Sequence, residues 1–239
     1  MSTFELIGFG PKGWGGLLLA GTILTLLVTV AAMLIGAAVG ALVAAAKLSP
    51  SRTSRIAGDA YTTVFRGVPE LLIIYLIYFG GGSAVGTIAS WFGSQSYVGV
   101  PAFLTGAVAV GLISASYQAE VFRGSFMAVA PGEIEAARAI GMSRFMRFRR
   151  IIVPQVLRFA LPGLGNVMQL SLKDSALISV TGLAELMRSS QVAAGSTRLY
   201  FTFYIAGCAL YLVLTTLSDR GFAFAEKRVG RSFRGGIGR

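Results

Sequence analysis

Two long stretches without a charged residue constrain this chain more than any other feature. Residues 13–46 and 71–119 contain no Asp, Glu, Lys or Arg. A helix needs about 20 mostly apolar residues to cross the hydrocarbon core of a bilayer. The first stretch suits one long or tilted helix, whereas the second is too long for one helix and is divided by Gly80–Gly82 and by the polar run 94–96. These stretches predict an integral membrane protein.

The composition agrees with a membrane location. Of 239 residues, 54% are hydrophobic and only 13% are charged, with a mean hydropathy of +0.72. Soluble domains carry about 25% charged residues. The net charge of +11 would suggest a nucleic-acid partner in a soluble protein, but here the basic residues fall between apolar runs. They are better explained as topology signals that face the cytoplasm and anionic lipid, so no nucleic-acid partner is expected.

The apolar segments predict one all-α membrane domain that covers residues 1–239. Gly36 and Gly40 form a GxxxG pair that allows close contact with another helix. Segments 84–92 and 180–198 are expected to lie along the membrane surface. Five transmembrane helices are expected, at about 16–46, 57–80, 101–125, 154–178 and 199–219.

The basic residues predict an orientation. Three lie in the first loop, seven between Arg123 and Arg158, and six in the tail from Arg220, whereas the opposite side carries only Lys12, Arg188 and Arg198. Cytoplasmic loops carry the excess of Lys and Arg. The N-terminus is therefore expected outside and the C-terminus in the cytoplasm.

Catalytic signatures are absent from the sequence. There is no histidine, which excludes Ser-His triads and histidine metal sites, and the single cysteine, Cys208, lies in an apolar run. No Gly-Lys dipeptide occurs, so the chain has no nucleotide-binding phosphate loop. We expect no enzyme activity, no metal and no cofactor in this chain.

The charged segment 131–154, PGEIEAARAIGMSRFMRFRRIIVP, carries the most specific pattern. It predicts a short helix with small residues on one face. A glycine then permits a sharp break that a residue with a β-carbon would resist, and a proline occupies the first turn of the next helix. A short helix that protrudes from the membrane is suited to docking a partner. The residues that define the pattern are Glu135, Ala136, Ala137, Gly141, Ile151 and Pro154.

This segment resembles the EAA loop, EAA-x3-G-x9-I-x2-P, of permease subunits in binding-protein-dependent ABC importers. We call residues 131–154 the EAA loop. Three further segments are similar to polar-amino-acid permeases, and together they cover most of residues 57–190. The overall resemblance is to the histidine/lysine/arginine/ornithine and opine (octopine, nopaline) branch, and within it to the "Q" member of a "Q/M" pair. The three segments are 65–72, 117–124 and 173–186.

The resemblance implies a type I ABC importer in the bacterial inner membrane, with this chain as a multi-pass permease subunit. Its partners would be a second permease subunit, two ATPase subunits that bind ATP and Mg²⁺, and a periplasmic solute-binding protein. The six EAA residues would couple the permease to the ATPase. The expected substrates are amino acids or opines, with basic ones favoured, although neutral or acidic polar amino acids remain open. Whether the second permease subunit is a homologous partner or another copy of this chain also remains open. A secondary transporter would need more spans or an internal repeat.

Charged residues inside spans are candidates for the substrate cavity because burying charge in lipid is costly. Arg66 and Glu70 are four residues apart and would share a helix face, as a cavity pair or a structural ion pair. Glu120 either faces a cationic substrate or pairs with Arg123. Lys173 and Asp174, after a helix loosened by Pro162, either bind the substrate's carboxylate and cation or extend to the interface. The complete candidate set is Arg66, Glu70, Tyr117, Glu120, Lys173 and Asp174.

Overall fold

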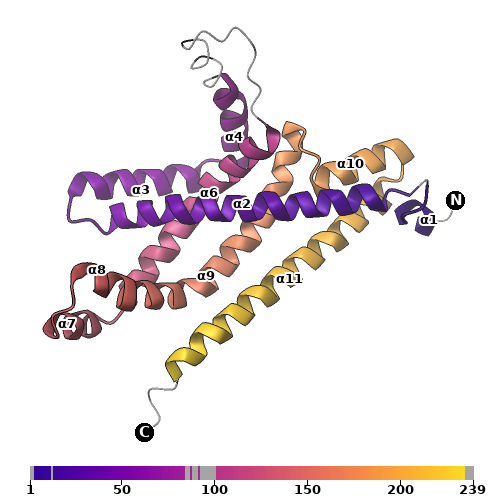
Figure 1. Cartoon of the computed structure of the whole chain (residues 1–239). Helices are drawn as coiled ribbons and strands as arrows, with labels where there is room; N and C mark the ends of the chain where they lie inside the picture. The colour runs from indigo at the N-terminus through magenta and orange to yellow at the C-terminus, as the bar shows by residue number, and fades with distance from the viewer. Residues whose placement is uncertain (1–2, 12, 84–86, 88–90, 92–100, 235–239) are drawn as a thin grey trace.

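Four long apolar helices form the frame of the molecule, which is seen here in a computed structural model. It describes residues 3–11, 13–83, 87, 91 and 101–234, and every regular element in them is helical. Each of the four helices, counted with its helical extensions, is long and apolar enough to cross a membrane. They are α2 (Gly15–Lys47), α6 (Ala102–Met127), α9 (Val153–Asp174) and α11 (Tyr200–Arg234) (Figure 1).

The segment expected as a continuous second helix, 57–80, is instead two helices. α3 (Arg52–Gly67) and α4 (Glu70–Tyr75), which runs into a π-helical turn at Leu76–Gly80, meet at an angle of 106°. Val68 between them has an extended backbone, with φ −93° and ψ 138°. Pro69 causes this break, because its ring disfavours the helical conformation in the preceding residue. Counting the bent pair as one broken span gives up to five spans.

Other boundaries differ from the expected ones by smaller amounts. α9 ends at Asp174 and continues as a 3₁₀ helix over Ser175–Thr181, and α11 extends to Arg234 rather than to 219. Within the expected surface segment 180–198, the structure has α10 (Leu186–Thr197). Most of the other expected surface segment, 84–92, lies outside the described residues.

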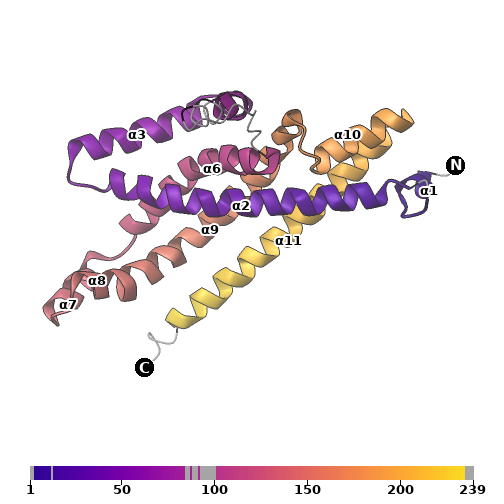
Figure 2. The same cartoon turned by 45° about the horizontal axis from the view of Figure 1, so that its top comes forward.

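The short helices of the EAA loop lie at one end of the molecule, and α1 (Thr3–Ile7) and α10 lie at the other end. The short helices of the EAA loop, α7 (Pro131–Ala139) and α8 (Arg144–Arg147), lie at the same end as the α2–α3 turn and the last turns of α11. Both views agree that α1 and α10 lie at the other end (Figures 1 and 2). The positively charged segments therefore gather at one end.

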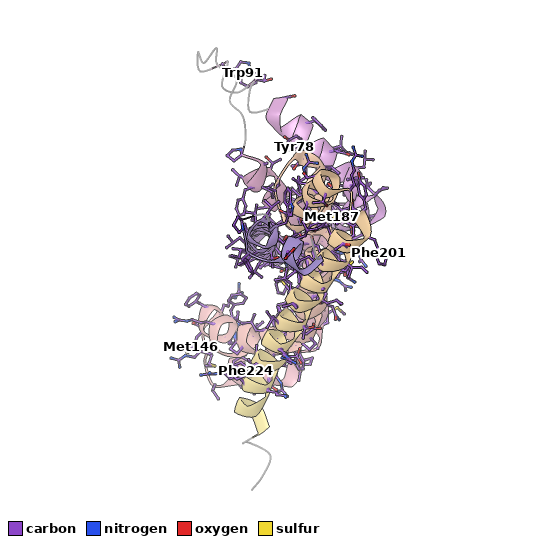
Figure 3. All side chains as sticks on the ribbon, turned by 90° about the vertical axis from the view of Figure 1, so that its right-hand side faces the viewer. Tyr78, Trp91, Met146, Met187, Phe201 and Phe224 are labelled. Carbon is purple, nitrogen blue, oxygen red and sulfur yellow. The ribbon has the colours of Figure 1, made fainter. Side chains whose placement is uncertain are left out.

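The tightest helix contact is between α2 and α6. A Cβ atom on Gly40 would lie 2.9 Å from the Ala115 carbonyl oxygen, and one on Gly36 would collide with Gln118. This confirms the close approach predicted from the GxxxG spacing. Large apolar side chains also lie on the outside of the helices. On α11, Phe201 and Phe224 are 80% and 66% exposed, as lipid-facing side chains would be (Figure 3).

Candidate functional site

The EAA loop presents a mixed apolar and charged surface at the end of the molecule. In α7 the Ala137 side chain is buried, while Glu135 and Ala136 are exposed. Two large apolar side chains of the same loop are also exposed: Ile140 is 78% exposed and Phe145 is 71% exposed. Exposed apolar groups on a charged, protruding loop are suited to docking another protein.

Gly141 ends α7 in a left-handed conformation, with φ +80°. The Met142 N–H donates to the Ala137 carbonyl and the Gly141 N–H donates to the Arg138 carbonyl, both at 3.0 Å. This pair of bonds is a Schellman cap, which satisfies carbonyl groups that the helix end would leave unpaired. The sharp break predicted at this glycine is confirmed.

Further contacts tie the loop to the helix that follows it. The Gln155 amide donates to the Glu133 carboxylate, which joins α7 to α9. Ser143 caps α8 by accepting a 3.3 Å hydrogen bond from the Met146 N–H. Ile151 lies half-buried in the π-helical turn Phe148–Ile152, and Pro154 occupies the first turn of α9, as predicted. The loop is therefore a braced unit.

A second polar site lies where the α3–α4 break meets α6 and α9. The carboxyl groups of Asp174 and Glu70 are near enough to interact electrostatically, and the Tyr117 hydroxyl lies in the field of both. Asp174 is only 8% exposed. We call Arg66, Glu70, Tyr117 and Asp174 the acidic-pair site. Two carboxyl groups this close repel each other when both are ionised, so the site favours a cation or a shared proton.

Arg66 joins this site through a different contact from the predicted one. Its guanidinium lies 5.3 Å from the centre of the Tyr117 ring, a cation–π distance. Among the ion pairs of the described residues, none joins Arg66 to Glu70. The expected shared helix face does not exist, because the 106° bend separates the two residues onto different helices.

The remaining predicted charges lie elsewhere. Lys173 is exposed, whereas its neighbour Asp174 is buried, so the two side chains occupy different faces of α9. Glu120 pairs with Arg123 at 3.0 Å, which was one of its two predicted roles, and also with Lys47. Sequence patterns thus identified four residues of one site, and two that do not join it.

A buried carboxylate at Glu185 was not singled out from the sequence. It is 0% exposed and caps α10 by accepting hydrogen bonds from the Met187 and Arg188 N–H groups, at 2.8 and 2.7 Å. The hydroxyls of Thr25 and Tyr211 donate to the same carboxylate. Burial raises the pKa of the Glu185 carboxyl above its ordinary value, although these four bonds oppose the shift. An acidic residue directly before a short helix was the available signal.

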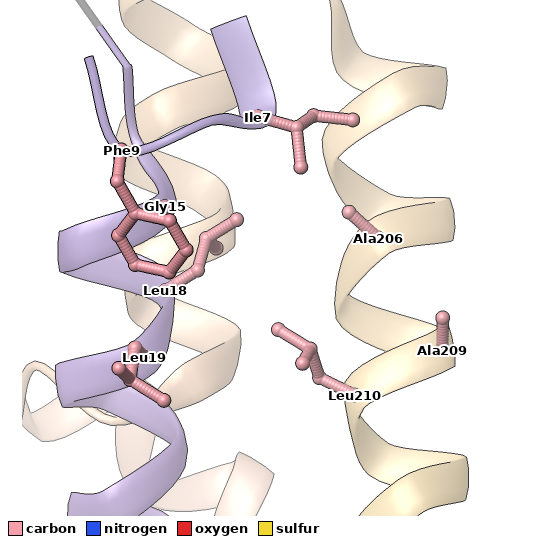
Figure 4. Close-up of a pocket in the computed structure, with 8 residues that line it drawn as sticks. All are labelled: Ile7, Phe9, Gly15, Leu18, Leu19, Ala206, Ala209 and Leu210. Atoms are coloured by element: carbon pink, nitrogen blue, oxygen red, sulfur yellow. The ribbon is translucent and has the colours of Figure 1, made fainter. Parts of the chain in front are cut away.

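Two hollows in the described part of the chain are apolar and differ from the acidic-pair site. One, of about 380 Å³, separates the first turns of α2 from α11, and Leu18 and Leu210 face each other across it (Figure 4). Another, of about 490 Å³, lies near the EAA loop between α2, α6 and α9. Neither offers the charged groups that an amino acid needs. The described residues also contain no cluster of His, Cys, Asp and Glu suited to a metal.

Apolar spanning helices, a braced loop at one end and a polar site at a helix break define a membrane permease. Residues 36–231 match the family described as the binding-protein-dependent transport system inner membrane component. The chain belongs to this family and is a permease subunit of an ABC importer in the inner membrane.

Named relatives align over nearly the whole chain. The octopine transport system permease protein OccQ of Rhizobium meliloti is 52% identical over 99% of this chain and 100% of its own length. The nopaline permease protein NocQ of Agrobacterium fabrum is 48% identical over 96% and 98%. The histidine/lysine/arginine/ornithine permease protein HisQ of Escherichia coli is 38% identical over 90% and 94%.

Solved structures share the fold. The crystal structure of an amino acid ABC transporter with histidines has a chain that is 35% identical, with a TM-score of 0.74 over 90% of this chain and 95% of that one. An inward-facing methionine ABC transporter chain is 18% identical, with a TM-score of 0.71 over 89% and 96%, which supports the fold alone.

Proposed function

We propose that this permease subunit imports amino acids or opines with a cationic group, and that the acidic-pair site contacts that group. The observation that carries the proposal is the close approach of Glu70 and Asp174 at the break between α3 and α4. A cationic side chain between two carboxyls relieves their repulsion, so binding is favourable there and less so for neutral substrates. The relatives named for histidine, lysine, arginine and ornithine support a basic substrate.

The site is open on a single chain, which fits a shared passage between two subunits. Arg66 is exposed, and Glu70 and Tyr117 are partly exposed. A second, homologous permease subunit would cover this face and complete the passage. The α-carboxylate of the substrate would then bind Arg66, whose guanidinium lies over the Tyr117 ring and can form bidentate bonds.

The energy for transport comes, in this proposal, from two ATPase subunits that bind ATP and Mg²⁺ and dock on the EAA loop. The loop's exposed Ile140 and Phe145 are the apolar anchors and its arginines the charged rim. This arrangement requires the loop and the C-terminus in the cytoplasm and the N-terminus outside, in line with the positive-inside rule. A periplasmic binding protein would deliver substrate to the opposite end, near α10.

A reconstituted transporter tests the substrate assignment. The permease, its partner subunit, the ATPase and the binding protein are placed in proteoliposomes, and uptake of arginine, ornithine, octopine and glutamine is measured. Asp174→Asn and Glu70→Gln should each lower uptake of the cationic substrates at least about ten-fold, a loss of about 1.4 kcal/mol. Asp219→Asn is the control, because Asp219 is exposed on α11 and, among the described residues, its carboxylate accepts a hydrogen bond from Gln169 and lies outside the acidic-pair site.

Two results would contradict the proposal. If both carboxyl variants take up arginine at the wild-type rate, the acidic pair does not contact the substrate. If the wild-type transporter prefers glutamine or an acidic amino acid with every binding protein tried, the substrate is neutral or acidic and the pair has another role.

A further inference from the structure

Lys47, the last residue of α2, joins three helices through one ammonium group. Its Nζ lies 3.0 Å from Asp59 Oδ1 and donates a 2.9 Å hydrogen bond to Thr62 Oγ1, both on α3. The same Nζ pairs with Glu120 on α6. The Lys47 side chain is only 9% exposed. The ammonium therefore donates two hydrogen bonds and lies beside two carboxylates, which compensate its charge where it is buried.

The backbone is adapted to this arrangement. A Cβ atom on Gly58 would lie 2.6 Å from Lys47 Cγ and 3.3 Å from the Val43 carbonyl oxygen. Because Gly58 has no side chain, the aliphatic part of the Lys47 side chain has room to pass between α2 and α3. A larger residue there would push the stem aside and separate the ammonium from α6.

Glu120 extends the contact toward the EAA loop. Its second carboxylate oxygen accepts a 3.0 Å hydrogen bond from Arg123 Nε, one turn further along α6. α6 ends at Met127 and α7 begins at Pro131. We call Lys47, Asp59, Thr62, Glu120 and Arg123 the Lys47 cluster. It lies within about three helical turns of the loop that meets the ATPase.

The same helices lead from the Lys47 cluster to the acidic-pair site. On α3, Thr62 and Arg66 are four residues apart, so they are neighbours on one face, one helical turn apart. On α6, Tyr117 and Glu120 are three residues apart and are neighbours in the same way. The Arg66 guanidinium lies over the Tyr117 ring. On both helices, the Lys47 cluster therefore lies one helical turn from the Arg66–Tyr117 contact, whose residues are proposed to meet the substrate.

We infer that Lys47 is a positioning residue that makes α2, α3 and α6 move together when the EAA loop is displaced, so that ATP-driven motion reaches the acidic-pair site. Without the ammonium, Glu120 and Asp59 lose their common cation, and α3 can remain in place while α6 moves. The inference rests on the proposed docking of the ATPase at the EAA loop.

The test uses the complete transporter in proteoliposomes. ATP hydrolysis with and without loaded binding protein, and substrate taken up per ATP hydrolysed, are measured for Lys47→Met and for Glu120→Gln. Each should assemble and hydrolyse ATP while its uptake per ATP falls about five-fold or more. The double variant should lose little more than either single one, because both act through one contact. Arg55→Met is the matched control, since Arg55 is exposed in the first turn of α3 and, among the described residues, its side chain donates hydrogen bonds to the Ser49 and Pro50 carbonyls.

Gly141→Ala in the EAA loop distinguishes a failure of the Lys47 inference from a failure of the docking proposal. If Gly141→Ala uncouples transport but both Lys47-cluster variants keep the wild-type ratio, the inference is wrong and the docking proposal stands. Additive losses in the double variant, or a parallel loss of assembly, hydrolysis and uptake in both single variants, would reduce the Lys47 cluster to a structural role. If Gly141→Ala also leaves the ratio unchanged, the docking proposal itself fails.

Discussion

Gly40 of α2 packs directly against the Ala115 carbonyl of α6, with space for no more than a hydrogen atom between them. Small residues allow helices in lipid to approach closely, and close packing supplies much of the association energy there. The contact holds α2 against the helix that leads into the EAA loop.

Gly40→Ala is expected to destabilise the protein by about 1–3 kcal/mol, because the new methyl group would lie 2.9 Å from a backbone oxygen that cannot rotate away. Thermal unfolding of the detergent-purified transporter measures the effect. Gly16→Ala in the first turn of the same helix has no atom within 4 Å of the new Cβ and should be nearly neutral. Equal melting temperatures for the two variants would show that the α2–α6 contact can relax.

Glu185 carries a second stability prediction. Glu185→Ala leaves the N–H groups of Met187 and Arg188 and two hydroxyls without their acceptor, at a cost of about 1–3 kcal/mol for each group that stays buried and unpaired. Tyr211→Phe removes only one of these bonds and should cost about 1 kcal/mol. The melting temperature should therefore fall much further for Glu185→Ala.

Glu185→Gln distinguishes charge from hydrogen bonding at this position. Glutamine keeps one oxygen acceptor and the side-chain length, so it should lie between the alanine variant and the wild type. A glutamine variant as unstable as the alanine variant would mean that the carboxylate's charge is essential for capping α10.

Hydropathy was sufficient to predict the frame of the fold. The expected helices at 16–46 and 101–125 correspond to α2 and α6 within one or two residues at each end. Such agreement follows from the bilayer, which imposes one length and one composition on every span. The break at Pro69 was not predicted, because an X-Pro dipeptide in an apolar run is compatible with a kinked helix as well as with a sharp bend.

The sites were predictable to different degrees. Gly141 could be assigned because its role is local: a helix end needs a left-handed residue at one position. The pairing of Glu70 with Asp174 is a contact across about a hundred residues, and no local pattern encodes it. Glu185 and Lys47 were missed as partners for the same reason, since each is satisfied by groups on helices that are distant in sequence.

The conformation of Gly141 supports a final prediction about the EAA loop. At φ +80° a residue with a β-carbon is strained by about 1–2 kcal/mol, so Gly141→Ala should weaken the Schellman cap and reorient α8 relative to α7. Gly141→Asn should be milder, because asparagine tolerates this region. Binding-protein-stimulated ATP hydrolysis and substrate uptake should therefore rank in the order wild type, asparagine, alanine. Gly132→Ala in the same loop is the control, because its Cβ would meet no atom within 4 Å. A transporter with Gly141→Ala that matches Gly132→Ala in both assays would show that the left-handed turn is not needed for coupling, and it would contradict the docking of the ATPase on the EAA loop.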